Sequence, residues 1–294
     1  MTEPHYPYVV VDVAAEDADE AGALLFELGA QGVELRDGTT LAHGVAGKVT
    51  LWAGFERHDE VRAALDALPS GWSPRAEQIV GDAWRDEWKK HFEPFRICDA
   101  IVVTPPWCTY DAAHDEQVAV LEPGRAFGTG LHETTRLVAA ILADRAAELR
   151  GARLLDVGCG SGILALVALL LGAEAVRAID VDPDATAVTR ENAERNGLAD
   201  RVRADSAPVS AISERYVAVV ANIEARTLVE LAPTLAPRVA PDGLLVLSGI
   251  LAPDIAPGQL DDVREAYRAL TVEEVRRDGE WVAVVLRSNA EPGR

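Results

Sequence analysis

The sequence predicts an α/β protein of two domains, in which a small antiparallel sheet precedes a larger, doubly wound parallel sheet. Two observations support this prediction: the length of the chain, and a change in the order of strands and helices near Ile101. With 294 residues, the chain is long enough for about two domains, and 49% of its residues are hydrophobic, which is enough to form a core in each. Intrinsic disorder is therefore excluded as its main state.

The first eighty residues contain alternating and amphipathic patterns that are typical of short strands and helices. They predict, in order, strand Tyr6 to Val13, helix Asp17 to Leu28, strand Gly32 to Arg36, strand Lys48 to Phe55, helix His58 to Leu68 and strand Ser73 to Val80. This βαββαβ order is the ferredoxin-like pattern, an antiparallel sheet with two helices on one face. Because the segment has no glycine-rich loop and its carboxylates and histidines are scattered, we expect residues 1–80 to recognise a substrate or to serve as a scaffold.

A segment of different composition, residues 81–98, connects this domain to the rest of the chain. Trp84, Trp88 and Phe92 recur every four residues, so they would lie on one face of a short helix that Pro94 ends. We interpret this face as core or inter-domain packing, and the alternative is an aromatic platform for a ligand. Residues 81–98 are therefore predicted to form a linker helix.

From Ile101 onward, strands alternate with longer helices. The predicted elements are helix Leu131 to Leu149, strand Ala152 to Val157, helix Gly162 to Leu171, strand Ala175 to Asp180, helix Asp184 to Asn196, a short strand near Arg201 to Ala204, strand Tyr216 to Ala221, helix Ala225 to Arg238, strand Gly243 to Ser248, a helix around Gln259 to Leu270, and strands Thr271 to Arg277 and Trp281 to Leu286. This alternation indicates a doubly wound, Rossmann-like sheet in residues 99–294, with its ligand at the carboxyl ends of the strands. The last two strands, joined by Asp278 to Glu280, predict a hairpin that gives the sheet an antiparallel edge.

The strongest local signal is the segment LLDVGCGSG, in which a buried apolar strand leads into Asp156, Gly158, Gly160 and Gly162 and then into a helix. Glycines at such a turn let the chain bend tightly and let a ligand approach the backbone at the helix N-terminus. Asp180 ends the next strand, where a carboxylate can accept hydrogen bonds from both ribose hydroxyls of an adenosine. The second domain is therefore expected to bind an adenosine-containing cofactor.

The spacing of the glycines distinguishes between two kinds of cofactor. Dinucleotide-binding folds use GxGxxG, but Ile163 stands where the third glycine of that motif would fall. A GxGxG segment preceded by an acidic residue, here Asp156, instead resembles the S-adenosylmethionine-dependent methyltransferases. An NAD site and an ordinary strand-to-helix turn are the less favoured alternatives.

Two further segments accompany the glycine motif. The stretch EPGRAFGTGLHETT, Glu122 to Thr135, contains a glycine-rich loop that can close over a ligand, and its Thr134 and Thr135 fall in the first turns of the next helix. Downstream, Asn222 follows a predicted strand, where its amide oxygen can face an incoming amine. The alternative for Asn222 is an ordinary helix cap.

The segments FGTGLHETT, LLDVGCGSGILAL, IDVDPDA, VVANI and LLVLSGIL, in this order behind a βαββαβ domain and a tryptophan-bearing linker, closely resemble the PrmA family of bacterial ribosomal protein L-eleven methyltransferases. The resemblance spans nearly the whole chain. It implies an S-adenosylmethionine-dependent enzyme that methylates lysine side chains and the N-terminal α-amine of a large-subunit ribosomal protein, which the N-terminal domain holds. By motif position, it implies cofactor contacts from Thr135, Gly158, Asp180 and Asn222. Asn222 is also the residue expected to position the amine.

No dedicated general base is expected at this site. His132 and Glu224 are the candidates, but each stands at the start of a helix, where the dipole favours an acidic residue such as Glu224 in any case. Both the NPPY-type signature of glutamine- and adenine-methylating enzymes and a metal-ligand cluster are absent, which leaves an aliphatic amine as the expected acceptor. Two alternatives stay open: a non-catalytic adenosine-binding adaptor, and a methyltransferase that acts on another protein or on a small amine.

Charge and composition limit the partners and the compartment. The net charge of −20, from 28 basic and 48 acidic residues, favours a basic partner over direct binding to nucleic acid. The longest apolar run, Ile163 to Leu171, is much shorter than the ~20 residues of a membrane span, and the N-terminus lacks a targeting pattern. Cys98, Cys108 and Cys159 form no CxxC pair and predict neither disulfides nor a zinc site. We therefore expect a cytoplasmic protein without a metal and away from membranes.

Overall fold

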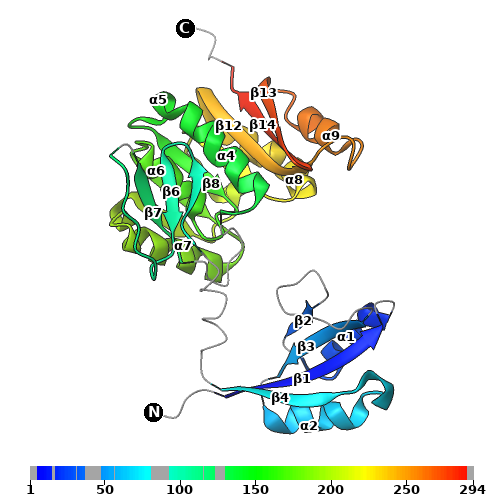
Figure 1. Cartoon of the computed structure of the whole chain (residues 1–294). Helices are drawn as coiled ribbons and strands as arrows, with labels where there is room; N and C mark the ends of the chain where they lie inside the picture. The colour runs from blue at the N-terminus through cyan, green and yellow to red at the C-terminus, as the bar shows by residue number, and fades with distance from the viewer. Residues whose placement is uncertain are drawn as a thin grey trace. The chain divides into compact units, whose positions relative to one another are not determined.

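The structure of the protein, a computed structural model, describes residues 5–14, 17–30, 32–36, 48–55, 57–80, 93–114, 116–122 and 130–289. The chain divides into two compact units, Met1–Phe92 and Glu93–Arg294 (Figure 1). Each unit has its own hydrophobic core. The helix expected to carry Trp84, Trp88 and Phe92 lies outside the described residues.

The first unit is built on a four-stranded sheet. Its elements are β1 (His5–Ala14), α1 (Ala18–Glu27), β2 (Gly32–Arg36), β3 (Lys48–Gly54), α2 (His58–Ala67), the 3-10 turn Ser70–Trp72 and β4 (Arg75–Val80). The strands pair antiparallel in the order β2-β3-β1-β4. Val9, Val11 and Val13 alternate along β1 and pack with Leu25 of α1 and Val61 of α2, so both helices cover the same face of this sheet.

The second unit begins with a small sheet that the sequence patterns do not predict. It consists of β5 (Phe95–Cys98), β6 (Ile101–Thr104) and β7 (Gln117–Val120). β5 pairs antiparallel with β6, and β6 pairs parallel with β7. Residues 95–98 were expected in the linker helix, but they form a strand because Ile97 and Cys98 are buried in the core of the second unit and Cys98 pairs with Ile101 across a tight turn.

The main sheet of the second unit has seven strands. The remaining elements are α4 (Glu133–Asp144), α5 (Ala146–Leu149), β8 (Arg153–Val157), α6 (Ile163–Leu170), β9 (Ala175–Ile179), α7 (Pro183–Arg195), β10 (Val202–Asp205), β11 (Tyr216–Asn222), α8 (Ala225–Leu235), β12 (Val239–Leu251), α9 (Gln259–Ala266), β13 (Thr271–Asp278) and β14 (Trp281–Arg287), with 3-10 turns at Ala199–Arg201, Val209–Ala211 and Ala236–Arg238. The strand order is β10-β9-β8-β11-β12-β14-β13. The first five strands in this order are parallel, and the predicted terminal hairpin, β13 and β14, forms the antiparallel edge.

Two predicted elements differ from the observed ones in this sheet and its helices. The single helix expected over Leu131 to Leu149 is divided at Arg145, whose φ of −108° leaves the helical range and separates α4 from α5. The strand expected over Gly243 to Ser248 extends in both directions as β12, because it pairs with β11 on one side and with β14 on the other.

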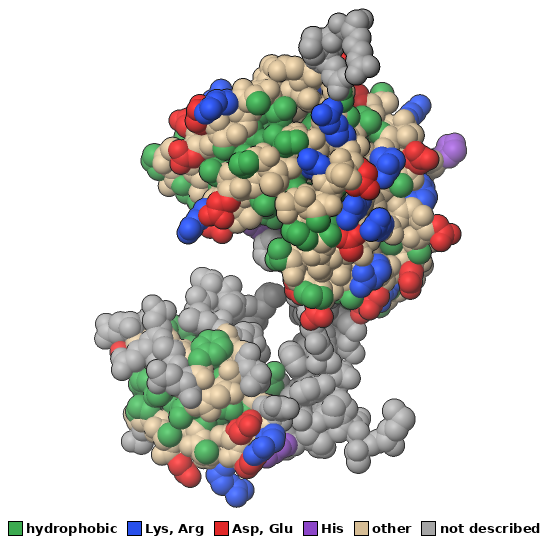
Figure 2. Space-filling view, turned by 180° about the vertical axis from the view of Figure 1, so that it is seen from behind, with side chains coloured by type: hydrophobic (Ala, Val, Ile, Leu, Met, Phe, Trp, Pro, Cys, Tyr) green, Lys and Arg blue, Asp and Glu red, His purple; other side chains and the backbone are tan. Residues whose placement is uncertain are grey.

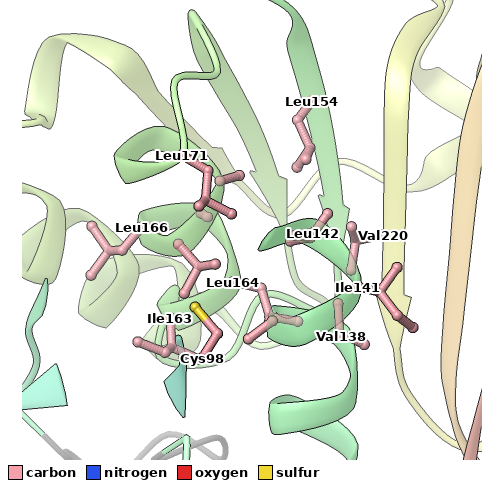
Figure 3. Packing of buried hydrophobic residues seen from close by; sticks show 14 of the residues in the cluster. Cys98, Val138, Ile141, Leu142, Leu154, Ile163, Leu164, Leu166, Leu171 and Val220 are labelled. Carbon is pink, nitrogen blue, oxygen red and sulfur yellow. The ribbon is translucent and has the colours of Figure 1, made fainter. Parts of the chain in front are cut away.

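Helices cover both faces of the main sheet and leave the ends of its strands open. Successive residues of β8 point to opposite faces: Leu154 joins the core formed with α4 and α6, and Leu155 joins the core formed with α8 and α9. Figure 3 shows the first of these cores, where Val138 and Leu142 of α4 lie near Leu164 of α6. With both faces buried, the carboxyl edge of the parallel strands is the place where this unit can bind a ligand.

Candidate active site

The glycine segment after β8 makes the tight turn that the sequence predicts. β8 lies between β9 and β11 and pairs parallel with both. Gly158, Gly160 and Gly162 all have positive φ angles, of 75°, 51° and 80°. Residues that carry a side chain rarely adopt such angles. The backbone N–H groups of Gly158 and Cys159 both donate to the carbonyl oxygen of Ile179, at 2.8 and 3.1 Å, and so fix the loop to the end of β9.

Asp180 follows β9 and is held against this glycine loop. One carboxylate oxygen, Oδ2, accepts a hydrogen bond from the backbone N–H of Gly160 at 3.0 Å, and Oδ1 accepts one from the N–H of Asp182 at 3.0 Å. Asp182 in turn caps α7 by accepting a hydrogen bond from the N–H of Asp184 at 2.9 Å. Each carboxylate oxygen of Asp180 has a second lone pair, so this half-buried group can still accept hydrogen bonds from a ligand.

Asn222 is the last residue of β11, and the fold brings it to Thr135 near the start of α4. The Nδ2 of Asn222 donates to the hydroxyl oxygen of Thr135 at 3.4 Å, and this fixes the amide plane. The side chain of Asn222 does not cap the next helix, because the residue at the N-cap of α8 is Glu224. The helix-cap alternative for Asn222 is therefore wrong, and its side chain contacts Thr135 instead.

One cavity of about 680 Å³ along the carboxyl edge of the main sheet joins these residues. This volume lies within the roughly 300–1,000 Å³ that small-molecule sites occupy. All four residues predicted to contact the cofactor line it, and they come from α4, β9, β11 and the glycine loop. The described residues that line it are His132, Thr134, Thr135, Val157, Gly158, Cys159, Gly160, Ile163, Leu164, Ile179, Asp180, Val181, Ala207, Pro208, Val209, Asn222, Ile223, Glu224, Thr227, Leu231, Gly249, Leu251, Gln259 and Trp281. Residues 123–129, the glycine-rich loop expected to close over a ligand, lie outside the described residues.

Ile223, which lines this cavity, lies in close contact with two of its glycines. A Cβ atom at Gly158 would lie 2.3 Å from the Cγ2 of Ile223, and one at Gly249 would lie 2.2 Å from the carbonyl oxygen of Ile223. Real Cβ atoms do not approach other atoms so closely. Glycine at these two positions therefore lets the ends of β8, β11 and β12 converge, and this convergence sets the position of Asn222.

Asp156 is a buried carboxyl in β8, two residues before Gly158 of the glycine loop. Its side chain is 1% exposed, and neither carboxylate oxygen has a hydrogen-bond partner among the described residues. Burial, together with the nearby negative charge of Asp180, raises the pKa of Asp156 from its ordinary value of 3.8 to about 7. The backbone N–H of Ala165, in the first turn of α6, lowers this pKa by a smaller amount. It is not placed to form a hydrogen bond with either carboxylate oxygen.

The cysteine of the glycine segment is not a reactive thiol. Cys159 is buried, and its Sγ accepts a hydrogen bond from the hydroxyl of Thr189 at 3.3 Å. Burial and the charge of Asp156 raise the pKa of this thiol to about 12, so it stays protonated at neutral pH. Within the part of the chain that the structure describes, no group of three or more His, Cys, Asp or Glu side chains could hold a metal ion.

Several residues of the cavity were not identified from the sequence. Gly249, Leu251, Gln259 and Trp281 come from β12, α9 and β14; Gly249 and Leu251 belong to the LLVLSGIL motif, but no site role was expected for any of the four. They reach the cavity because β14 runs antiparallel to β12, so that Trp281, its first residue, lies opposite Leu251, the last residue of β12. The sequence predicted the terminal hairpin but not the strand that it pairs with.

Comparison with known proteins adds independent information to this geometry. The family model described as ribosomal protein L11 methyltransferase (PrmA) matches residues 5–289. The chain is 55% identical to a ribosomal protein L11 methyltransferase of Sorangium cellulosum over 273 residues, which are 91% of this chain and 84% of that protein. It is 37% identical to one of Pelobacter propionicus over 303 residues, covering 96% and 97% of the two chains.

A solved structure agrees with these sequence matches. The crystal structure of a ribosomal protein L11 methylase from Lactobacillus delbrueckii subsp. bulgaricus superposes with a TM-score of 0.60 and 28% identity. The superposition covers 67% of this chain and all of the other. This neighbour supports the α/β fold of helices around a large mixed sheet.

We expect Gly249→Ala to destabilise the protein more than Gly258→Ala does. The two glycines have nearly equal φ angles, 85° and 89°, so the backbone strain added by a side chain is similar, about 1–2 kcal/mol. A Cβ at residue 258 meets nothing within 4 Å, whereas one at residue 249 would collide with the backbone of Ile223. Urea unfolding should therefore show an additional loss of roughly 1–3 kcal/mol in Gly249→Ala. Equal losses in the two variants would contradict a close packing of β12 on Ile223.

The raised pKa of Asp156 makes the stability of the protein depend on pH. Because this carboxyl binds its proton more tightly in the folded chain than in the unfolded one, its ionisation opposes folding. The free energy of unfolding should fall as the pH rises from 3.8 to about 7, by up to about 4 kcal/mol from this group. We expect Asp156→Asn to remove this fall, as measured by urea unfolding at several pH values, with the exposed Asp184→Asn as a charge-matched control. A slope equal to that of the native chain would show that Asp156 does not titrate in this range.

Proposed function

Because the chain belongs to the ribosomal protein L11 methyltransferase (PrmA) family, we propose that it methylates ribosomal protein L11, on lysine side-chain amines and on the N-terminal α-amine. The family predicted from the sequence is confirmed, and with it the enzyme class and S-adenosylmethionine as the cofactor. The observation that carries the proposal for this chain is the convergence of Thr135, Gly158, Asp180 and Asn222 on one cavity.

The positions of these four residues support a distinct role for each. Gly158 lets the cofactor approach the backbone at the end of β8, and Asp180, already fixed by Gly160, accepts hydrogen bonds from the ribose hydroxyls. A hydrogen bond joins Thr135 and Asn222. In the strand order, Asn222 ends β11 on one side of β8 and its glycine loop, and Asp180 follows β9 on the other side. This arrangement supports a role for Asn222 in positioning the amine beside the methyl group.

Bound S-adenosylmethionine supplies a methyl group on a positively charged sulfur, which needs little further activation. The protein must chiefly hold the acceptor in line with that methyl group, and such positioning can supply about 7–11 kcal/mol. A lysine amine with a pKa of ~10.4 is neutral in only about one molecule in a thousand at pH 7.4, a penalty of roughly 4 kcal/mol. The apolar walls of the cavity, which include Ile223, Leu231 and Leu251, reduce this penalty because burial lowers the pKa of an amine.

The charges around the cavity match a cationic acceptor. Among its described lining residues, the charged side chains are Asp180 and Glu224, both carboxylates, and there is no lysine or arginine. The net charge of −20 likewise favours a basic partner such as a ribosomal protein. On the face of the second unit seen in Figure 2, basic and acidic side chains are interspersed, which does not resemble the continuous basic surface of a nucleic-acid-binding protein.

The first unit is assigned the role of substrate recognition. Its element order and the sheet order β2-β3-β1-β4 support a ferredoxin-like domain in residues 1–80, followed by a linker and by the methyltransferase domain, which begins with β5.

None of the helices in the described part of the chain has the length and apolar content that a membrane span requires. We propose that the enzyme acts in the cytoplasm, because its ribosomal substrate is made there.

The proposed function predicts that Asp180→Ala weakens binding of the cofactor. Loss of charge-assisted hydrogen bonds to the ribose should raise the Kd for S-adenosylmethionine by roughly 30-fold or more in isothermal titration calorimetry. Asp184→Ala removes the same charge from an exposed position nearby and should leave the Kd unchanged. Intact-mass spectrometry of purified L11 should show added methyl groups with the native enzyme and few with Asp180→Ala. Cofactor binding by the native chain without methylation of L11 would instead favour an adaptor or another substrate.

The proposed mechanism has no dedicated general base, and this predicts the pH dependence of the rate. His132 is engaged as the N-cap of α4, since its Nδ1 accepts a hydrogen bond from the N–H of Thr134 at 3.3 Å, and Glu224 is the exposed N-cap residue of α8. We expect Asn222→Ala to lower kcat strongly because the amine loses its alignment, whereas His132→Ala and Glu224→Ala should retain the native pH–rate profile. If either of these two variants lost a pKa from that profile, the residue would be a general base.

A further inference from the structure

The cavity extends beyond the residues assigned to the cofactor. In the order of the sheet, Asp180 and the glycine loop belong to β9 and β8, Asn222 ends β11, and the cavity continues over β12 and β14. If the cofactor occupies the β8 and β9 side and its methyl group faces Asn222, the β12 and β14 side lies on the far side of that methyl group. This second part of the cavity needs an occupant other than the cofactor.

The walls of this second part are apolar and fixed. Leu251 lies at the end of β12, and Trp281 stands opposite it at the start of β14. The side chain of Gln259 accepts a hydrogen bond from the backbone N–H of Leu251 at 2.5 Å and so attaches the first turn of α9 to this wall. The ring of Trp281 packs edge-to-face against that of His132, with centroids 5.1 Å apart, and this contact fixes its orientation.

We propose that a slot lined by Leu251 and Trp281 binds the acceptor side chain, with its methylene stem along Leu251 and its amine against the Trp281 ring. This inference rests on the proposed function and identifies where the lysine of that reaction enters. A slot with apolar walls, an aromatic face and only carboxylates as charged neighbours is complementary to an alkylammonium group.

An aromatic wall also suits an acceptor that is methylated more than once. In each transfer, the nitrogen lone pair forms the new N–C bond, the electrons of the broken C–S bond stay on the sulfur, and one N–H proton must leave to water before the next transfer. The amine therefore loses one hydrogen-bond donor per methyl group, while its protonated form keeps its positive charge. Attraction to the face of an indole depends on that charge and persists through every stage.

The test compares Trp281→Leu with Trp281→Phe in the full-length enzyme. Leucine keeps apolar bulk but removes the ring, whereas phenylalanine keeps a ring, and Ile255→Ala, an exposed position outside the cavity, is the control. The readouts are the Kd for S-adenosylhomocysteine by calorimetry, KM and kcat with purified L11, and the distribution of methylation states by intact mass. Thermal unfolding of each variant separates loss of fold from loss of binding.

For Trp281→Leu, we expect the Kd for S-adenosylhomocysteine to stay within about twofold of native and KM for L11 to rise roughly 3- to 30-fold. Products should shift toward lower methylation states than those of the native enzyme, and Trp281→Phe should recover most of both effects. A Kd weakened as much as KM would place Trp281 in the cofactor part of the cavity and overturn the proposal. An unchanged KM with an unchanged product distribution would also overturn it.

A failure of the proposed function can be told apart from a failure of this inference. If the native enzyme binds S-adenosylmethionine but transfers no methyl group to L11, the proposed function is wrong. The slot is then tested by titrating free Nε-trimethyl-lysine into the native and Trp281→Leu enzymes loaded with S-adenosylhomocysteine. Weaker binding to Trp281→Leu would support the slot, and equal binding or no binding would overturn it.

Discussion

The site depends on how closely three strand ends approach one another around Ile223. This approach is possible because Gly158 and Gly249 carry no Cβ, at points where such an atom would lie 2.3 and 2.2 Å from atoms of Ile223. The contact joins β8, which leads into the glycine loop, to β12, which leads into the apolar slot, with β11 between them. Asn222 directly precedes Ile223, so the same contact determines where its amide lies between the two parts of the cavity.

The electrostatics of the site oppose folding in part. Asp156 and Asp180 lie close enough for one carboxylate to raise the pKa of the other, and Asp156 is buried without a hydrogen-bond partner in the described chain. Such an arrangement destabilises the folded protein by itself. It also creates a negative potential at the edge of the sheet, which attracts the positively charged sulfonium of the cofactor and an approaching basic substrate. Binding of a positively charged ligand therefore offsets the unfavourable interaction between these two carboxylates.

Most of the architecture could be predicted from the sequence because it is encoded locally. The alternation of strands and helices after residue 100, the glycine turn at Gly158 and the terminal hairpin all follow from short-range patterns, and the structure contains each of them. The small sheet β5-β6-β7 was missed because its strands have four residues each and pair partly in parallel across a long connection. Trp281 was missed for a different reason: its place in the cavity depends on which strand β14 pairs with, and no local pattern encodes that choice.

The position of β14 in the sheet has a consequence for the biosynthesis of the enzyme. The glycine loop, Asp180 and Asn222 all leave the ribosome well before Trp281, because β14 follows them in the sequence. Yet β14 lies inside the sheet, between β12 and β13, and supplies one wall of the cavity. A nascent chain that has emerged only as far as α9 would hold every residue of the cofactor motif and still lack a finished pocket, with β12 as an unpaired edge. The cavity is thus complete only when the final hairpin has joined the sheet beside β12.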